Sequence, residues 1–572
     1  MYSVHPHIPK KNTTYTRKRL RSIALISVLC LFLLGTGITI SYSLLERPAG
    51  AQANTLVPLP GHVPALIKKS QLLGPTDPTT SITLMIGLRP RNQAGLKAYV
   101  DSISRRSSAT GRHYLTPAQV TTAFSPLPAN QYAVISYMQQ MGLKETVTFK
   151  HHLLIGFQGT TGQAEQAFHI QINNYRSPAG SEFYAPSSEP GVPAALGSII
   201  QSVSGLDTVA HFTHPPMLTP KQINSATSTP QVTSCIQQTS GSPWKTPRQI
   251  TGAYNIAGLY NQGFHGEGQT VGLFELDDYS TNDIHAYTSC FGGAAVPISR
   301  ILVSGGTGQG PGSGAIEVEL DMELVLSTAP HLASLRVYEA PNSAAGVLAE
   351  WSRIVSDGVP VVSTSWGLCE AHITQSFAQQ ENTLLMVAAA QGQTVLAASG
   401  DNGSDGCMDG KFGVDDPAAQ PFITGVGGTT LNVGTDPQGI GIYNGEVVWN
   451  NGTFQNSARA SGGGISMYWT IPSWQHAIGV PSTDSSAAPC AANTGNTGQN
   501  CREVPDVALD TDPNTGYIIY CSAGTTCQGQ TWLTVGGTSA AAPMWAVMIA
   551  LANEKSLHDG NFNLGFINPL LY

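Results

Sequence analysis

A serine near the carboxyl end of this chain has the surroundings of a nucleophile. Ser539 lies in the sequence Gly-Gly-Thr-Ser-Ala-Ala-Ala-Pro at positions 536–543, where small neighbours would let another polypeptide backbone approach the hydroxyl. We expect a buried helix to begin here, because a helix N-terminus favours negative charge that develops beside it. Gly-Thr-Ser also forms ordinary turns and helix caps, so the interpretation depends on the acids that accompany the serine.

Two acids at helical spacing are candidates for activating that hydroxyl. Glu317 and Asp321 are four residues apart, so a helix would present both carboxyls on one face. Like charges forced together raise one pKa, which leaves one group ionised and its partner neutral. The ionised carboxylate can take the Ser539 proton as a general base, oriented by the second acid. The alternative is a solvated acidic helix face, which the nearby Glu319 and Glu323 permit.

Three further candidates lie at the ends of apolar segments that are typical of strands. Asp401 follows one segment; if protonated it could donate a hydrogen bond to an oxyanion, and if ionised it would repel one. Trp366 follows a second segment, within Ser-Trp-Gly, and Glu275 ends a third. Strand carboxyl ends in doubly wound sheets are where ligands bind. The alternatives are a Gly-Asp-Asn-Gly turn for Asp401, a core aromatic for Trp366 and a strand cap for Glu275.

The second half of the chain alternates short apolar runs with helical patterns. This alternation predicts an α/β domain with a subtilisin-like, doubly wound and mostly parallel sheet. We expect 434–499, which is rich in Gly, Asn and Ser, to form long surface loops. The expected strands are 270–276, 332–339, 359–365, 394–399 and 422–427, and the expected helices are 317–326, 344–356 and 371–390.

The preceding segment has a different pattern of apolar residues, which ends near Leu206. Its apolar periodicity predicts β-α-β-β-α-β, a ferredoxin-like α/β sandwich. A stretch rich in Pro, Thr, Ser and Gln follows at 212–243; it cannot bury a core, and we expect an exposed linker that proteases cut. The expected strands of the sandwich are 82–89, 145–150, 152–157 and 170–175, and its helices are 93–105, 130–141 and 161–168.

The N-terminus has the pattern of a targeting or anchoring segment. Basic residues between positions 10 and 21 precede an apolar run at 23–45 that is long enough to span a bilayer. Ala-Gln-Ala at 51–53 resembles a signal cleavage site, so a cleaved signal and an uncleaved anchor both remain open. In either case we expect everything after about residue 54 to lie outside the cytoplasm.

Cysteine usage agrees with export. Cys30 lies in the apolar run, and the other eight cysteines all fall in the second half of the chain. An even number in one exported domain predicts disulfides, and zinc is disfavoured because no Cys-x-x-Cys occurs. The natural local pairs are Cys490 with Cys501 and Cys521 with Cys527; the remaining four are Cys235, Cys290, Cys369 and Cys407.

Charge is divided unevenly along the chain. The net charge is −8, but residues 1–243 contribute 19 Lys and Arg against 8 Asp and Glu, and residues 244–572 contribute 9 against 28. A basic half joined to an acidic half predicts that the two pack on each other. A nucleic-acid-binding arm is disfavoured, because the positive residues are scattered and form no stripe.

Together these segments resemble the sedolisin, or serine-carboxyl, peptidase family over nearly all of residues 75–570. The order Glu, Asp, Asp, Ser matches, as do Ser-Trp-Gly and Gly-Thr-Ser-Ala-Ala-Ala-Pro. The leading domain resembles a pro-kumamolisin-type activation domain, including Asn-Tyr-Arg at 174–176 and Phe-Tyr-Ala-Pro at 183–186 before Val-Pro-Ala at 192–194. The resemblance implies these roles: Ser539 as nucleophile, Glu317 as base, Asp321 as its partner, Asp401 as oxyanion-hole acid with the Ser539 N–H, and Glu275 and Trp366 as extensions of the carboxyl network.

The resemblance implies an acid-active, serine-type endopeptidase made as a self-processing precursor. Its substrates would be polypeptides, and its own leading domain would act as inhibitor and chaperone; we expect a monomer and no nucleic-acid partner. Acid suits the expected chemistry, since Asp401 must be protonated to donate and a histidine base would be charged. The basic leading domain could cover the acidic domain at neutral pH and loosen in acid. The expected divisions are 1–54, 55–211, 212–243 and 244–572.

The resemblance also predicts a bound Ca²⁺ ion, and two other functions remain open. The family places a Ca²⁺ site well beyond the serine, but only 33 residues follow Ser539; Ca²⁺ is therefore expected from the resemblance alone and no ligand is assigned. One rival is a subtilisin-type peptidase with a histidine base, for which His265 or His285 and Asp277 or Asp278 are available. The other rival is a catalytically inactive, surface-anchored binding protein.

Overall fold

The computed structural model describes residues 55–104, 113–213, 221–222, 235, 244–308, 310–452, 459–476, 480, 490, 500–527 and 531–572. The predicted signal or membrane segment at 23–45 and nearly all of the 212–243 linker lie outside the described residues. In the part of the chain that is described, none of the helices combines the length and the apolar character needed to cross a bilayer.

The second domain is built on a sheet whose strands follow the order β12-β13-β11-β14-β16-β18-β19, with β22 also paired to β18. Neighbours are parallel, except that β19 is antiparallel to β18. The chain enters at β11, adds β12 and β13 on one side and then β14, β16 and β18 on the other, which is the predicted doubly wound arrangement. The bounds are β11 Thr270–Glu275, β12 Ile298–Leu302, β13 Ser334–Glu339, β14 Val361–Thr364, β16 Thr394–Ala398, β18 Thr424–Thr435, β19 Gly441–Val448 and β22 Val507–Asp510.

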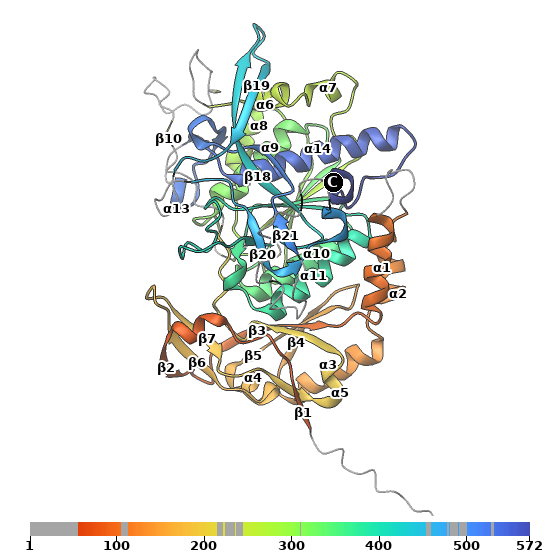
Figure 1. Cartoon of the computed structure of the whole chain (residues 1–572), viewed down its shortest axis with the longest axis vertical. Helices are drawn as coiled ribbons and strands as arrows, with labels where there is room; N and C mark the ends of the chain where they lie inside the picture. The colour runs from red at the N-terminus through yellow and green to blue at the C-terminus, as the bar shows by residue number, and fades with distance from the viewer. Residues whose placement is uncertain are drawn as a thin grey trace, which may run out of the picture. The chain divides into compact units, whose positions relative to one another are not determined.

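Helices cover both faces of this sheet, which is why its central strands are apolar without alternation. The helices α9 (Ala315–Thr328) and α14 (Thr538–His558) pack together on one face. The helices α10 (Ala344–Asp357) and α11 (Gln375–Ala390) pack together on the other (Figure 1). The expected strands and helices of this domain are present within a few residues of their predicted ends, except that β18 continues to Thr435, eight residues beyond the predicted end at 427.

One prediction for this domain is wrong. The range 434–499 contains β19 and β20 (Gly464–Thr470) as well as loops, so it is not surface loop throughout. The strand β20 pairs with β21 (Cys501–Val504) in a separate two-stranded sheet. The sequence did not indicate these strands, because the range is rich in Gly and Asn and both residue types are typical of turns.

The leading domain has the predicted ferredoxin-like sheet, but its last strand is not the expected one. The antiparallel order is β4-β5-β3-β9, and the fourth strand is β9, not the predicted 170–175. The expected strand corresponds to β6 (Ile172–Arg176), which pairs with β2 and β7 in a side sheet. The other bounds are β2 Gln71–Pro75, β3 Ser81–Leu88, α1 Gln93–Ser104, α2 Pro117–Phe124, α3 Pro128–Gln140, β4 Lys144–Thr148, β5 Leu154–Thr160, α4 Thr161–Phe168, β7 Glu182–Pro186 and β9 Ile200–Ser204.

Both faces of the leading sheet are buried. Along β3, Leu84 and Ile86 belong to the leading domain's own core, whereas Met85 between them belongs to the large core of the second domain. Side chains alternate between the two faces of a strand. One face of this sheet therefore requires the second domain to cover it.

The contact between the two domains lies mainly on α10 and α11 (Figure 1), and the hydrogen bonds across it join uncharged groups. The Gln201 side-chain amide donates to the Gln379 carbonyl and to the Thr383 hydroxyl, both at 2.9 Å. The buried His151 ring lies 3.2 Å from the Ser352 carbonyl oxygen. Within the described residues no ion pair joins the two domains. Among the described residues, hydrogen bonds between uncharged groups and apolar packing, and not direct ion pairs, make this contact.

The eight cysteines of the second half form four disulfides. The two predicted local pairs, Cys490–Cys501 and Cys521–Cys527, are confirmed. The sequence left the other four unassigned, and the structure pairs them as Cys235–Cys290 and Cys369–Cys407. With the sulfurs of all eight bonded to one another, the zinc alternative is wrong for these cysteines.

Candidate active site

The candidate residues meet at the carboxyl edge of the sheet, because neighbouring parallel strands end there. Glu275 ends β11, Trp366 follows β14 and Asp401 follows β16. From the helical face, Ser539 lies in the first turn of α14. The acids of α9 are buried in full: Glu317, Glu319, Asp321 and Glu323 are each 0% exposed. The alternative of a solvated acidic face for this helix is therefore wrong.

Glu317 lies between the serine and a second acid. Burial and the charges of Asp321 and Asp401 raise its pKa well above the ordinary value, while hydrogen bonding with Ser539 and Ser365 acts in the opposite direction. The contact with the serine is loose, since among the described residues the Ser539 hydroxyl has no hydrogen bond of ordinary geometry. Such contacts are often long in an unliganded enzyme and tighten when substrate binds.

Ser365, immediately after β14, positions the second acid. Its hydroxyl lies 3.0 and 2.9 Å from the two carboxyl oxygens of Asp321 and 3.2 Å from the backbone carbonyl oxygen of Ser539. The pKa of Asp321 is raised well above its ordinary value by burial and by the charge of Glu275, and the Ser365 hydrogen bond moderates the rise. One hydroxyl thus connects the acids to the serine-bearing helix.

Glu275 and Trp366 form the outer part of the cluster. The Trp366 indole N–H donates to Glu275 at 2.8 Å. Burial raises the pKa of Glu275 well above its ordinary value; the indole hydrogen bond lowers it and the charge of Glu317 raises it further. These acids therefore titrate together, and each ionisation makes the next more costly.

Asp401 is fixed on the other side of the serine. One of its oxygens accepts from the Thr538 N–H at 2.8 Å and from the Thr538 hydroxyl at 2.9 Å. Its other oxygen faces Gly537, where an added Cβ would lie only 2.5 Å away and where φ is +118°. Burial raises the pKa of Asp401 to about 6, while the Thr538 hydrogen bonds and the charge of Arg459 limit the rise. Below about that pH the carboxyl is protonated and can donate a hydrogen bond.

A cavity of about 580 Å³ opens beside these groups. Its lining includes Ser365, Trp366 and Asp401 from the strand ends, together with Phe212 and Thr213 from the end of the leading domain. Ser539 itself is 1% exposed and does not line this cavity, which reaches the site through Ser365 and Asp401. The arrangement can perform proton transfer from a hydroxyl and can stabilise a developing oxyanion.

Sequence reasoning missed three residues of this constellation: Ser365, Thr538 and Arg459. Ser365 precedes Trp366 and Thr538 precedes Ser539 in the sequence. Their position next to these candidates was the signal that could have found them. Arg459 had none, since it lies 58 positions from Asp401 in a Gly- and Ser-rich segment and acts on Asp401 only through the fold.

The residues of the histidine alternative are engaged elsewhere. His265 stacks on Tyr260 with ring centroids 5.1 Å apart, and His285 is exposed on α8 (Thr281–Phe291). In the described part of the chain neither imidazole donates to or accepts from the Ser539 hydroxyl.

The two aspartates of the histidine alternative also have other partners. Asp277 accepts from two backbone N–H groups of the loop before α9, those of Gly312 and Gly314, and Asp278 pairs with Arg300.

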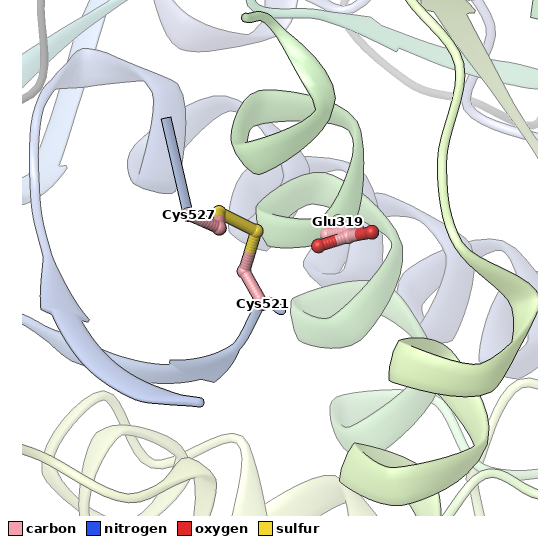
Figure 2. Close-up of side chains that lie close together, drawn as sticks. All are labelled: Glu319, Cys521 and Cys527. Carbon is pink, nitrogen blue, oxygen red and sulfur yellow. A yellow bond between two sulfur atoms is a disulfide. The ribbon is translucent and has the colours of Figure 1, made fainter. Parts of the chain in front are cut away.

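One grouping of ligand-type atoms lies near the site. Glu319, Cys521 and Cys527 approach one another closely enough to suggest a metal ion, and among the described residues they are the only such set. Figure 2 shows that the two sulfurs are bonded to each other beside Glu319 of α9. A disulfide offers no thiolate, so these residues do not fit a metal site.

Comparison with known proteins agrees with this geometry. The family model described as the pro-kumamolisin activation domain matches residues 68–209, and that of the subtilase family matches residues 326–560. Kumamolisin of Bacillus sp. (strain MN-32) is 32% identical over 422 residues, which cover 72% of this chain and 69% of that protein. The chain belongs to the sedolisin family.

Other relatives of this sedolisin-family chain span both of its domains. Sedolisin of Pseudomonas sp. (strain 101) is 29% identical over 83% of this chain and 77% of its own length. Tripeptidyl-peptidase 1 of Homo sapiens is 28% identical over 87% of this chain and 84% of its own length. The chain is thus a serine-type peptidase of the serine-carboxyl class, with an activation domain before the peptidase domain.

The buried acids of this sedolisin-family chain predict greatest stability in acid. Burial raises the pKa of Glu319 to about 9, of Glu370 and Asp415 to about 8, and of Glu339 to about 7, against roughly 4 in an unfolded chain. Because the folded values are the higher ones, stability is fully present below about pH 4 and is lost as pH rises through the folded values. We expect the Tm of a Ser539→Ala precursor, followed by circular dichroism, to fall steadily from pH 4 to pH 8; a rise would contradict this.

Ser365→Ala should uncouple the acids from the serine-bearing helix. We expect the rate of peptide hydrolysis to fall about 10- to 100-fold, with a loss of about 1 to 3 kcal/mol in the free energy of unfolding. The matched control is Ser363→Ala in β14, two residues before Ser365, because among the described residues the buried hydroxyl of Ser363 has no hydrogen-bond partner. Equal activity of the two variants, measured at the same pH, would exclude a positioning role for Ser365.

Proposed function

We propose that this chain is the precursor of an acid-active endopeptidase that processes itself and that uses a carboxylate in place of histidine as general base. The observation that supports this most directly is the burial of Glu317 between Asp321 and Ser539, with Asp401 on the opposite side of the serine. In this proposal Ser539 is the nucleophile, Glu317 the base, Asp321 its partner and Asp401 the oxyanion-hole acid.

The proposed reaction starts with attack of the Ser539 oxygen on the substrate carbonyl carbon while Glu317 takes the hydroxyl proton. The oxyanion that forms accepts hydrogen bonds from protonated Asp401 and from the backbone N–H of Ser539. Glu317 then gives its proton to the leaving amine, and the C–N bond breaks to leave an acyl-enzyme. A water molecule, deprotonated by Glu317, attacks the ester and releases the acid product and the serine.

The required protonation states set the proposed pH range. Asp401 must be neutral to donate, and its pKa of about 6 means that this form is lost as pH rises through that value. Glu317 must be ionised, which burial opposes. Protonation of Asp321, Glu275 and Asp401 removes their repulsion, so in acid a single negative charge can reside on Glu317.

Further parts of the proposal concern location and activation. We infer export across a membrane through residues 23–45, as a secreted or an anchored protein, with the leading domain as intramolecular inhibitor and chaperone of a monomeric enzyme. The predicted processing segment is 212–243. Dependence on Ca²⁺ stays a prediction of the family resemblance, and we propose no ligands for it.

The decisive test is incubation of purified precursor from about pH 3 to 8, a range that brackets the ordinary carboxyl and histidine pKa values. We expect cleavage within 212–243 in acid, read by N-terminal sequencing, and none with Ser539→Ala. Glu317→Gln should slow cleavage about 100- to 10,000-fold, whereas His265→Ala should leave it unchanged.

Full activity of Glu317→Gln would reject the carboxylate base, and an inert parent chain would favour a binding protein. A peptide substrate distinguishes internal cleavage from removal of N-terminal tripeptides, the activity in the name of the human relative.

Arg459 should set the upper pH limit of activity. Its charge lowers the pKa of Asp401, so Arg459→Leu should raise that pKa and keep Asp401 protonated to higher pH. We therefore expect the falling limb of the profile of kcat/KM against pH to move toward neutrality, while Arg459→Lys, which keeps the charge, should leave it near the parent position. Movement of the limb toward acid in Arg459→Leu would contradict the role given to Asp401.

A further inference from the structure

The loop that leads into the helix of the proposed base is held from outside by a single carboxyl group. Asp277, two residues beyond the end of β11, accepts hydrogen bonds from three backbone N–H groups. One of its oxygens accepts from Asp278 at 2.7 Å and from Gly312 at 2.9 Å, and the other accepts from Gly314 at 2.7 Å. An ionised carboxyl group has only acceptors, so it can satisfy all three donors at once.

Helix α9 begins at this loop without a capping side chain of its own. Its N-cap residue is Gly314, which has no side chain to accept hydrogen bonds from the first turn. The Gly314 carbonyl oxygen accepts from the Glu317 N–H at 2.9 Å, so the placement of Gly314 sets the backbone of the proposed base. Because Asp277 binds the N–H of that same glycine, it determines where the helix starts.

Close packing leaves the loop little room to move away from Asp277. A Cβ on Gly312 would lie 2.6 Å from an Asp277 oxygen, and a Cβ on Gly314 would lie 2.5 Å from the Trp366 ring. The Gly312 carbonyl oxygen also accepts from the Thr525 N–H at 3.1 Å. Only glycine fits at these two positions, and a shift of the loop is passed on to the first turn of α9.

Asp277 reaches the cavity beside the catalytic groups, but its hydrogen bonds all go to the backbone. It is half-buried and lines the cavity together with Ser313 and Gly314. Burial is the main cause of the raised pKa of Glu275, and the charge of Asp277 adds to it. The hydrogen bonds act through α9 instead, where a displacement of a reacting group by about 1 Å can cost about 100-fold in rate.

We propose that Asp277 is a positioning residue that fixes the backbone of Gly312 and Gly314 and thereby the first turn of α9. Through that turn it keeps the carboxyl group of Glu317 directed at Ser539. This inference rests on the proposed function, because it takes Glu317 to be the base. It also gives a role to an acid that the histidine alternative would have placed in direct contact with an imidazole.

The first test compares kcat and KM of Asp277→Asn with those of the parent, using enzyme processed from the full chain and an internally quenched peptide. The amide has the shape of the carboxyl group, but its NH2 cannot accept from a backbone N–H. We expect kcat, measured at the pH optimum of each enzyme, to fall about 10- to 100-fold while KM stays within about threefold of the parent value.

The matched control is Asp436→Asn in the turn between β18 and β19, which should leave kcat unchanged. Asp436 likewise accepts from two backbone N–H groups, those of Gln438 at 2.9 Å and Ile440 at 2.7 Å. Equal kcat of the two variants would overturn the inference. A raised KM with an unchanged kcat would also overturn it, because Asp277 would then bind substrate. Either result leaves the proposed function intact, whereas full activity of Glu317→Gln would overturn both.

A small carboxylate tests the same contact by replacing the missing group. In Asp277→Ala the truncated side chain leaves space that opens to the cavity, and formate at about pH 5 is mostly ionised, since ordinary carboxyl pKa values are about 4. We expect formate to raise kcat of this variant about 3- to 10-fold, whereas chloride at the same ionic strength, or formate added to the parent, should not. Absence of a response in an Asp277→Ala enzyme whose circular dichroism spectrum equals that of the parent would overturn the inference.

Discussion

Carboxyl groups that are buried side by side cannot all be ionised, and this constraint governs the site. The charge of Glu317 acts on Glu275, that of Glu275 on Asp321, and those of Asp321 and Asp401 on Glu317. Water is excluded from them, so each added negative charge is costly. The cluster therefore retains protons at pH values where exposed carboxyls have lost them. In the proposed mechanism, the number of protons that the cluster holds decides whether the serine has a proton acceptor and the oxyanion a hydrogen-bond donor.

The fold must oppose the cost of burying so many acids. The helix α9 is buried on all sides because the sheet, α14 and the disulfide-closed segment at 521–527 surround it. Hydrogen bonds from fixed donors compensate part of the penalty: the Tyr520 N–H donates to Glu323 at 2.9 Å and the Ser280 N–H to Glu319 at 2.9 Å. Low pH supplies the remainder, because protonated carboxyls are far less costly to bury. Stability and the proposed chemistry thus favour the same pH.

The sequence was sufficient to predict most strands of the large sheet and to single out the acids that lie near Ser539. Both predictions rest on local properties, namely the spacing of apolar residues and the position of a residue at a strand end. It failed where a choice depended on distant partners. Residues 170–175 and 200–204 are both plausible strands, and only packing decides that the second completes the leading sheet. The acids of α9 have the spacing of an exposed face, and the surrounding layers alone reveal their burial. The pairing of Cys369 with Cys407 likewise depends on loops that meet only in the fold.

The neutral contact between the domains bears on how acid would act in a precursor that processes itself. Loss of carboxylate charge cannot release an ion pair that the described contact does not contain, so the first effect of acid falls on the site. Asp401 gains its proton near pH 6, while residues 212 and 213 already lie in the cavity. His151, which is in the interdomain contact, has its pKa lowered to about 4 by burial and so stays neutral until the solution is more acidic. Under the proposed function, this order places protonation of Asp401 before protonation of His151, which favours cleavage of the linker while the leading domain is still docked.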